Sequence, residues 1–415
     1  MSFYLETKTS AASAQPEDTR VLAAILVGPD MLPSGQSVGY DASGRLRVGQ
    51  LETLNILTAK NADDALMMVN SGTGTGTWTS TGYTMACTGV QWLIRAGKHR
   101  TAYVPGRSHQ VEITGYRLEN QAGCVKRVGY FDSSTVSPHT ANFDGFYFEA
   151  DGTDYRFSIE RNGTDVMNVP RASWNGSQAA KDHDFSKFTV FLFDFLWLGG
   201  AVFRVFIKTT SGFALAHQFD YAGTEANVFM ITPNHRVRYE IRGPGTMTAV
   251  CAQVSTEGSV SGVGKGRAVE NAAVVPCAAI GTHYPLIAIR LGAGFLDETI
   301  KQVGATLYLS SSTDVGIMRI CLNPTFSAPL TYAAVPNSAA ESAVGNGTIT
   351  VSDFGSVLYS QFARSDAITP QNILLSDFLS QLGSTVAGVS DQLVVVFTPI
   401  TTTIDARASL IFKQF

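Results

Sequence analysis

Charged residues are scarce in this sequence. Asp, Glu, Lys and Arg together make up 15% of its 415 residues, and the formal net charge is -4. Soluble domains usually carry about a quarter charged residues. A protein that wraps nucleic acid needs an excess of positive charge, so we expect no nucleic-acid partner. Low charge instead suits surfaces that are buried in an assembly of subunits.

Cysteine and histidine are also too few and too scattered to build a familiar metal site. None of the five cysteines stands in a C-x-x-C pair, and the seven histidines show neither H-x-H nor H-E-x-x-H spacing. We therefore predict no metal and no cofactor. The default for the thiols is the reduced, buried state, although one non-local disulfide stays open. The cysteines are Cys87, Cys124, Cys251, Cys277 and Cys321.

The sequence lacks a visible export signal and a long apolar run. Its first residues have no basic head followed by an apolar core. The longest apolar run, Val190–Leu198, contains Asp194 and is shorter than the roughly 20 residues that a spanning helix needs. We expect a soluble chain that folds in a cytoplasm and does not insert into a membrane.

The most apolar stretch is the segment that we expect to organise the fold. On an extended chain, Phe191, Phe193, Phe195 and Trp197 point one way, and Val190, Leu192 and Leu196 point the other way. An extended segment that is apolar on both faces is typical of a strand buried between two layers.

Short segments rich in β-branched and aromatic residues alternate with turn residues along most of the chain, and helical periodicity is nearly absent. The sequence therefore predicts an all-β protein. We expect an extended N-terminal arm (1–60), a jelly-roll-like β-sandwich (61–256), a glycine-rich linker (257–271) and a second, smaller β-domain (272–415). The best helix candidate is Ile373–Gly383, and Ala62–Val69 could form a single helical turn.

No nucleophile motif is present, so any catalytic site would have to be found from individual ionisable residues. Asp194 stands in the most apolar strand, and a buried carboxylate needs a partner, which Arg204 or His217 could supply. One interpretation is an acid–base pair with a raised pKa. The favoured interpretation is a buried ion pair that fixes the strand register.

A group of acidic residues could also suggest a calcium loop or a glycosidase pair. The group lacks the Asp-x-Asp-x-Asp-Gly order of a calcium loop, and its members fall at strand ends and turns, where acids are common. The group consists of Asp144, Glu149, Asp151, Asp154 and Glu160.

A basic segment interleaved with aromatic residues leaves two interpretations open. It could form a nucleic-acid face, but a polar interface or a solvated sheet face is favoured because its charges alternate along strands. The segment contains Arg95, Lys98, Arg100, Arg107, Arg117, Lys126 and Arg127.

Seven phrases in order resemble virion structural proteins of tailed bacteriophages and some large DNA viruses. They cover about residues 45–256, and the family offers no catalytic residues to carry over. The phrases are Arg100–Ser108, Val125–Asp132, Asp144–Gly152, Val169–Gly176, Phe193–Gly199, Met230–Asn234 and Arg238–Ile241.

The resemblance implies a non-enzymatic component of a virus particle, such as a phage fibre, collar, baseplate or capsid-decorating subunit. Its expected partners are further copies of itself, as a trimer or another symmetric homo-oligomer, and other virion proteins; its expected location is the virion.

The alternative is a carbohydrate- or receptor-binding protein that contacts a host surface glycan through exposed aromatic residues, for which Trp78, Trp174 and Tyr284 are the candidates. A third hypothesis, a glycan-degrading enzyme, requires two carboxyl groups within about 10 Å in a cleft.

Overall fold

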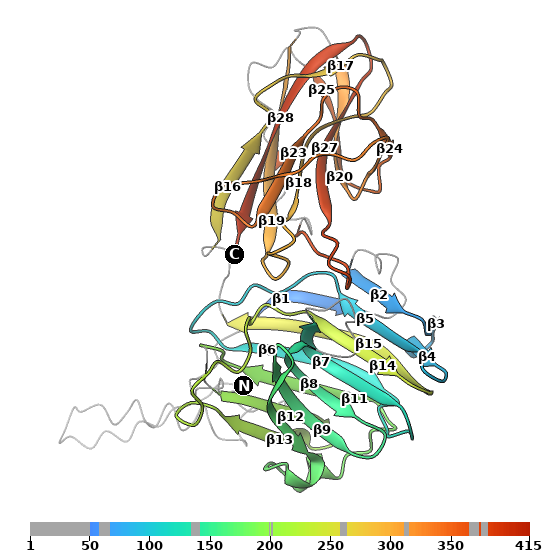
Figure 1. Cartoon of the computed structure of the whole chain (residues 1–415), viewed down its shortest axis with the longest axis vertical. Coiled ribbons are helices and arrows are strands. Elements are labelled where there is room, and N and C mark those ends of the chain that lie inside the picture. The colour runs from blue at the N-terminus through green and yellow to red at the C-terminus, as the bar shows by residue number, and fades with distance from the viewer. Residues whose placement is uncertain are drawn as a thin grey trace, which may run out of the picture.

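The structure is a computed structural model, and it describes residues 50–57, 67–133, 142–198, 200, 202–257, 264–310, 315–364, 373–374 and 381–415. These residues form two β-domains stacked end to end (Figure 1). The chain is all-β, with a jelly-roll-like β-sandwich followed by a smaller β-domain, as the sequence predicted. Most of the predicted arm (1–60) lies outside the described residues, but residues 50–57 form a strand of the sandwich.

The first sheet of the sandwich has the strand order β13-β12-β11-β6-β15-β4-β3, and β1 pairs with β15. Neighbouring strands run antiparallel. The strands are β1 (Gln50–Leu57), β3 (Thr75–Thr79), β4 (Gly82–Cys87), β6 (His109–Tyr116), β11 (Thr189–Phe195), β12 (Val202–Thr209), β13 (Gly212–Asp220) and β15 (Gly245–Glu257).

The second sheet of the sandwich has the order β10-β9-β8-β7-β14-β5-β2 and is also antiparallel. Its strands are β2 (Met68–Gly72), β5 (Trp92–Gly97), β7 (Val125–Ser133), β8 (Phe143–Ala150), β9 (Tyr155–Arg161), β10 (Thr164–Pro170) and β14 (Val237–Arg242). Two short helices, η1 (Arg171–Ser173) and α3 (Gln178–Lys181), follow β10.

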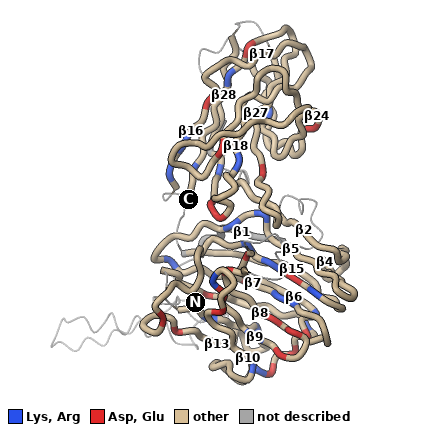
Figure 2. The backbone as a smooth tube through the Cα atoms, in the orientation of Figure 1, with Lys and Arg blue, Asp and Glu red and all other residues tan. Residues whose placement is uncertain are grey.

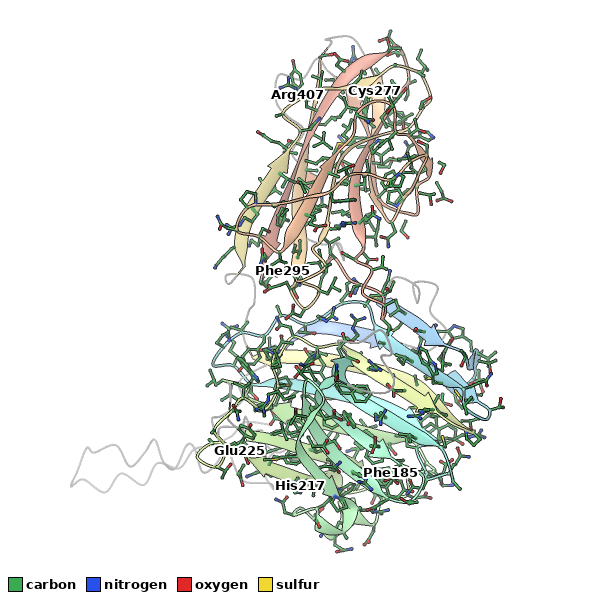
Figure 3. All side chains as sticks on the ribbon, in the orientation of Figure 1. Phe185, His217, Glu225, Cys277, Phe295 and Arg407 are labelled. Carbon is green, nitrogen blue, oxygen red and sulfur yellow. The ribbon has the colours of Figure 1, made fainter. Side chains whose placement is uncertain are left out.

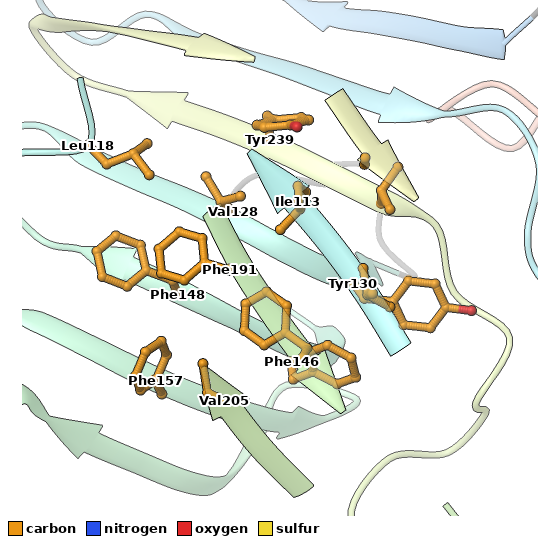
Figure 4. Packing of buried hydrophobic residues seen from close by; sticks show 14 of the residues in the cluster. Ile113, Leu118, Val128, Tyr130, Phe146, Phe148, Phe157, Phe191, Val205 and Tyr239 are labelled. Carbon is orange, nitrogen blue, oxygen red and sulfur yellow. The ribbon is translucent and has the colours of Figure 1, made fainter. Parts of the chain in front are cut away.

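Aromatic side chains from both sheets fill the core between them (Figure 4). The rings of Phe148 and Phe191 lie 4.8 Å apart, and those of Phe146 and Phe193 lie 5.2 Å apart. Each such pair contributes about 0.5–1.5 kcal/mol beyond the burial of its area. The stretch that we expected to organise the fold therefore does so through one face.

The other face of β11 differs from the prediction that both faces are buried. Val190 and Leu192 are only partly buried, because no third layer of described strands covers this part of the outer face, whereas Asp194 and Leu196 further along the same side are buried. An apolar side chain on an outer face costs little when it is half exposed.

The second domain contains a five-stranded sheet with the order β16-β28-β19-β26, in which β17 also pairs with β28, and a six-stranded sheet with the order β22-β23-β18-β27-β20-β25. The strands of the first are β16 (Lys265–Glu270), β17 (Val275–Cys277), β19 (Ile300–Leu309), β26 (Ile373–Leu374) and β28 (Ile404–Gln414). Those of the second are β18 (Tyr284–Leu291), β20 (Val315–Leu322), β22 (Ala333–Ala334), β23 (Ala340–Val344), β25 (Ser356–Arg364) and β27 (Gln392–Pro399). A small pair, β21 (Thr325–Phe326) and β24 (Val351–Asp353), completes the domain.

In this domain, two segments adopt a structure other than the one predicted from the sequence. Residues 265–270, expected in the linker, form β16 because they pair with the long strand β28. Ile373 and Leu374, expected to begin a helix, form β26 and pair with β19. Short apolar runs fit a helix or a strand equally well, and the available sheet edge decides. The centre of the predicted helix, 375–380, lies outside the described residues.

Charged residues of both signs are spread over the two domains, with long uncharged stretches between them (Figure 2). All five cysteines are unpaired, and four of them are buried. Within the described residues, no helix is long and apolar enough to cross a bilayer.

The second domain rests on the end of the sandwich at β2 and β5. Val386, in the segment that precedes β27, packs against Ile94 and Ala96 on the outer face of β5. Polar contacts surround this apolar contact and join the domains further.

Candidate functional site

A cavity of about 650 Å³ lies where the two domains meet. This volume is within the usual range for small-molecule sites, about 300–1,000 Å³. The sandwich contributes Arg100, Asp132, Ser133, Asp144, Asn162, Ile231, Thr232, His235 and Arg236. The second domain contributes Ala293, Gly294, Leu296, Asp297, Thr385, Val386, Ala387 and Gly388.

Two carboxylates come from neighbouring strands of the sandwich. Asp132 on β7 is the register partner of Asp144 on β8, and both line the cavity. Opposite residues of an antiparallel pair project from the same face of the sheet. Strand pairing alone therefore brings these two acids to one site.

Three arginines hold Asp132. Its carboxylate lies 2.8 Å from Nε of Arg236 and 3.7 Å from Nη1 of Arg238, and it also pairs with Arg100. Burial alone would raise the pKa of Asp132, but Arg236, Arg100 and Arg238 together hold this pKa well below its usual range. Asp132 is therefore a fixed anion that offsets part of the positive charge of the three arginines.

Asp144 anchors the loop that precedes β14. It accepts hydrogen bonds from the backbone N–H groups of Ile231 (2.9 Å) and Thr232 (3.3 Å), and Nε2 of His235 lies 3.0 Å from Oδ2. Burial raises the pKa of Asp144, but the contact with His235 and the backbone donors outweigh burial and lower it. Asp144 thus shapes one wall of the cavity.

Arginine side chains of the sandwich reach across to the second domain beneath the cavity. Arg236 donates from Nη1 to the carbonyl of Ser384 (3.1 Å) and from Nη2 to its hydroxyl (2.9 Å). Arg100 donates to the same hydroxyl (3.0 Å) and to the carbonyl of Leu296. Because Arg100 and Arg236 are also paired with Asp132, one network fixes both domains.

Other backbone contacts close the junction. The carbonyl of Arg100 accepts hydrogen bonds from Nε2 of Gln381 (2.6 Å) and from the hydroxyl of Thr299 (3.1 Å). The backbone N–H of Ser384 donates to the carbonyl of Lys98 (3.0 Å). The segment 98–100 of the sandwich therefore carries much of the inter-domain contact.

The rest of the lining mixes hydroxyl groups with apolar side chains. The hydroxyl oxygens of Thr232 and Thr385 accept backbone hydrogen bonds from Asn234 (3.2 Å) and Val389 (3.0 Å), which leaves their protons to donate. Ile231 is 58% exposed. Such a wall can hydrogen-bond a polar ligand and contact its apolar face.

An aromatic ring stands at the same junction. Phe295 is 50% exposed and lies between Gly294 and Leu296, which both line the cavity. Figure 3 places it at the end of the second domain that faces the sandwich. Among the described residues, no cluster of three or more His, Cys, Asp or Glu side chains could hold a metal ion.

The ion pair that the sequence suggested lies in the sandwich, away from the cavity lining. Nη2 of Arg204 is 2.5 Å from Oδ2 of Asp194, and the hydroxyl of Ser108 donates to Oδ1 (2.8 Å). Asp194 and Arg204 are register partners on β11 and β12. His217 does not join them: its Nδ1 accepts a hydrogen bond from the backbone N–H of Asn175 (3.1 Å), and burial lowers its pKa to about 4.

The expectation of exposed aromatic platforms is wrong for two of the three candidates. Trp174 is 1% exposed, its indole N–H donates to the carbonyl of Val169 (3.2 Å), and its ring stacks on Phe157. Tyr284 is 3% exposed in the core of the second domain. Only Trp78 is partly exposed, and it packs edge-on against Tyr83.

Sequence reasoning found part of the cavity and missed the rest. It singled out Asp144 within an acidic group and Arg100 within a basic segment, for which it favoured a polar interface or a solvated sheet face. It missed Asp132 and His235 in the lining, and Ser384 in the network beneath it, because strand pairing and the domain contact bring them together; Ser384, for example, is 284 positions from its partner Arg100. No local spacing carries that information.

No family model matches this chain, and no curated protein matches it. Among solved structures, a legume lectin-like domain from Entamoeba histolytica is 9% identical, with a TM-score of 0.34; the match covers 50% of this chain and 98% of that one. A lectin from Bauhinia forficata in complex with GalNAc is 10% identical (TM-score 0.32; 50% and 98% covered). A β-glucanase from Bacillus licheniformis is 12% identical (TM-score 0.32; 51% and 99% covered). Similarity at this level says nothing about function, so the function is inferred below from the residues that line the cavity.

Proposed function

We propose that this chain is a non-enzymatic binding protein that holds a saccharide in the cavity between its two domains. The observation that carries the proposal is the lining, in which the hydroxyls of Thr232 and Thr385 stand beside apolar groups such as Ile231 and Leu296. A sugar ring presents hydroxyl groups at its edge and C–H groups on its face, and this lining can contact both.

The state of the two carboxylates favours binding over hydrolysis. A glycosidase needs one carboxylic acid whose pKa is raised, so that it can protonate the leaving group. Asp132 and Asp144 both have lowered pKa values, because each is surrounded by donors from arginine, histidine or the backbone. Neither is suited to act as a general acid near neutral pH.

The first test is a glycan array with the full-length chain, followed by titration of the best saccharide against Thr232→Val. Loss of one neutral hydrogen bond should weaken binding by roughly 3- to 10-fold. Thr402→Val, at an exposed position on the loop after β27, is the matched control and should bind like the wild type.

Two results would count against the proposal. Equal binding by Thr232→Val and the wild type, or an array without any hit, would remove the saccharide from the cavity. Release of new reducing ends from the bound saccharide would show that the chain is an enzyme.

A second candidate function is a structural role in a particle, and the edge strand β25 favours it. β25 pairs only with β20 among the described strands, and Arg364 is its single charged residue. Phe362 is 69% exposed and Val357 is 45% exposed. A long edge that carries a single charge is a ready surface for another strand.

Light scattering would test this candidate. If β25 joins copies of the chain, Phe362→Asp should lower the oligomeric mass. Phe188→Asp, at a 50% exposed position before β11, should leave the mass unchanged. A wild-type monomer that is absent from purified virions would rule the structural role out.

A further inference from the structure

His99 is a buried imidazole at the contact between the two domains. It is 4% exposed and lies between Lys98 and Arg100, which both bond to the second domain. The imidazole hydrogen-bonds the backbone of Gln381, across the junction. Its Nδ1 atom has no hydrogen-bond partner among the described residues.

Charged groups from three segments face this imidazole. They are Lys98 on its own segment, Arg236 at the residue before β14, and Asp391 from the second domain. Asp391 is already engaged, because it pairs with Nζ of Lys98 (3.0 Å) and accepts from Nδ2 of Asn323 (2.6 Å) and from the N–H of Gly383 (3.1 Å). Two cations therefore face His99, and the one nearby anion has its own partners.

Neutral His99 fits this environment, and protonated His99 does not. Protonation would place an N–H at Nδ1, which has no acceptor among the described residues. It would also place a positive charge in a buried site, where the attraction of Asp391 does not offset the cost of burial and the repulsion from Lys98 and Arg236. A buried donor without a partner destabilises the state that contains it, and more so when the donor is charged. Burial, in agreement with this geometry, lowers the pKa of His99 to about 4.

We propose that His99 is an acid-sensitive latch: its protonation releases the second domain from the sandwich and opens the cavity between them. If a saccharide occupies the cavity, opening at acidic pH would release it, and this consequence rests on the proposed function. The opening of the junction itself does not depend on that function. The latch thus adds a means of regulation to the same site.

The sign of the effect follows from the two states. In the closed state the pKa of His99 is about 4, and in an open, solvated state it returns to its ordinary value of 6.5. Opening therefore takes up a proton, so the closed junction is at full strength above pH 6.5 and weakens as the pH falls toward 4. A shift of this size corresponds to a change of roughly 300-fold in the opening equilibrium.

Small-angle X-ray scattering on the full-length chain without ligand, between about pH 7.5 and about pH 4.5, tests the latch directly. The wild type should become more extended as the pH falls, while its far-ultraviolet circular dichroism stays constant. His99→Gln keeps a donor for Gln381 but cannot gain a charge, and it should stay compact. The matched control is His217→Gln, because the pKa of His217 is also lowered to about 4 and it lies at the far end of the sandwich (Figure 3). This control should open like the wild type.

Hydrogen exchange gives a second measurement that needs no variant. The amide of Ser384 donates across the junction, so a peptide covering 381–391 should lose protection in acid after correction for the intrinsic rate. The neighbouring strand β27 should not. A wild type that stays closed and protected at about pH 4.5, or a folded His99→Gln variant that opens like the wild type, would overturn the latch. Failure of the wild type to bind any saccharide at neutral pH would count against the proposed function but not against the latch.

Discussion

Nζ of Lys98 in the sandwich lies 3.0 Å from Oδ1 of Asp391 in the second domain, and both side chains are almost fully buried. These two residues are 293 positions apart in the chain. A buried ion pair of this kind is weak evidence of net stabilisation, but removing one partner strands the other charge. The pair therefore makes the stability of each domain depend on the other.

Asp391→Ala should destabilise the protein by about 3–5 kcal/mol, because it leaves the ammonium of Lys98 buried without a counter-ion. Thermal unfolding followed by calorimetry should then separate into two transitions, one for each domain. The control is Glu341→Ala, which breaks a half-exposed pair with Arg290 inside the second domain and should cost less than about 1 kcal/mol. Equal effects of the two substitutions would contradict the inter-domain role.

Asp132 should make the protein sensitive to strong acid. Its pKa in the folded state lies below its ordinary value of 3.8, so its contribution to stability is complete above pH 3.8 and is lost as the pH falls further. Asp132→Asn should lower the free energy of unfolding at neutral pH by about 3–5 kcal/mol. It should also flatten the dependence of that free energy on pH below 3.8, as measured by urea titrations. An unchanged acid dependence would show that the arginines do not hold Asp132 as described.

Trp174 should behave as a core residue. Trp174→Ala should cost about 3–5 kcal/mol of unfolding free energy, because the ring is buried against Phe157 and its removal leaves a cavity. Trp78→Ala, at a partly exposed position, should cost clearly less. Similar losses for both tryptophans in chemical denaturation would contradict the burial of Trp174.

The pair Asp194–Arg204 should be more costly to break than to replace. Arg204→Met strands a buried carboxylate and should destabilise the sandwich by about 3–5 kcal/mol, whereas Arg204→Met combined with Asp194→Leu should recover a large part of this loss. Denaturation of the two single variants and the double variant forms a complete mutant cycle. A double variant as unstable as Arg204→Met alone would show that the pair stabilises the sandwich beyond charge balance.

Much of the fold was predictable because strands leave a local signal. The alternation around Phe191 and Phe193 indicates a strand with an inward face, and Asp194 and Arg204 could be paired because a short connection joins their strands. The helix expected at Ile373 failed because an apolar run of that length fits two states, and contact with β19 decided between them.

The cavity was less predictable because contacts between distant segments create it. Asp132 and Asp144 meet through strand register, and Ser384 meets Arg236 only after both domains have formed. Trp174 shows that a local signal can also mislead. A tryptophan followed by Asn-Gly suggests an exposed turn, yet stacking on Phe157 buries it.

Filling the cavity with a side chain shows whether a saccharide occupies it. Gly294 lines it, and a Cβ atom added there meets nothing within 4 Å. Gly294→Leu should therefore fold normally and occupy space that the ligand needs. Gly266→Leu, on the exposed strand β16 with equal room for a side chain, is the matched control. Calorimetric titration with the best saccharide from the array should show at least about a tenfold weaker Kd, or about 1.4 kcal/mol, for Gly294→Leu and an unchanged Kd for Gly266→Leu. Equal binding by both variants would place the saccharide outside the cavity.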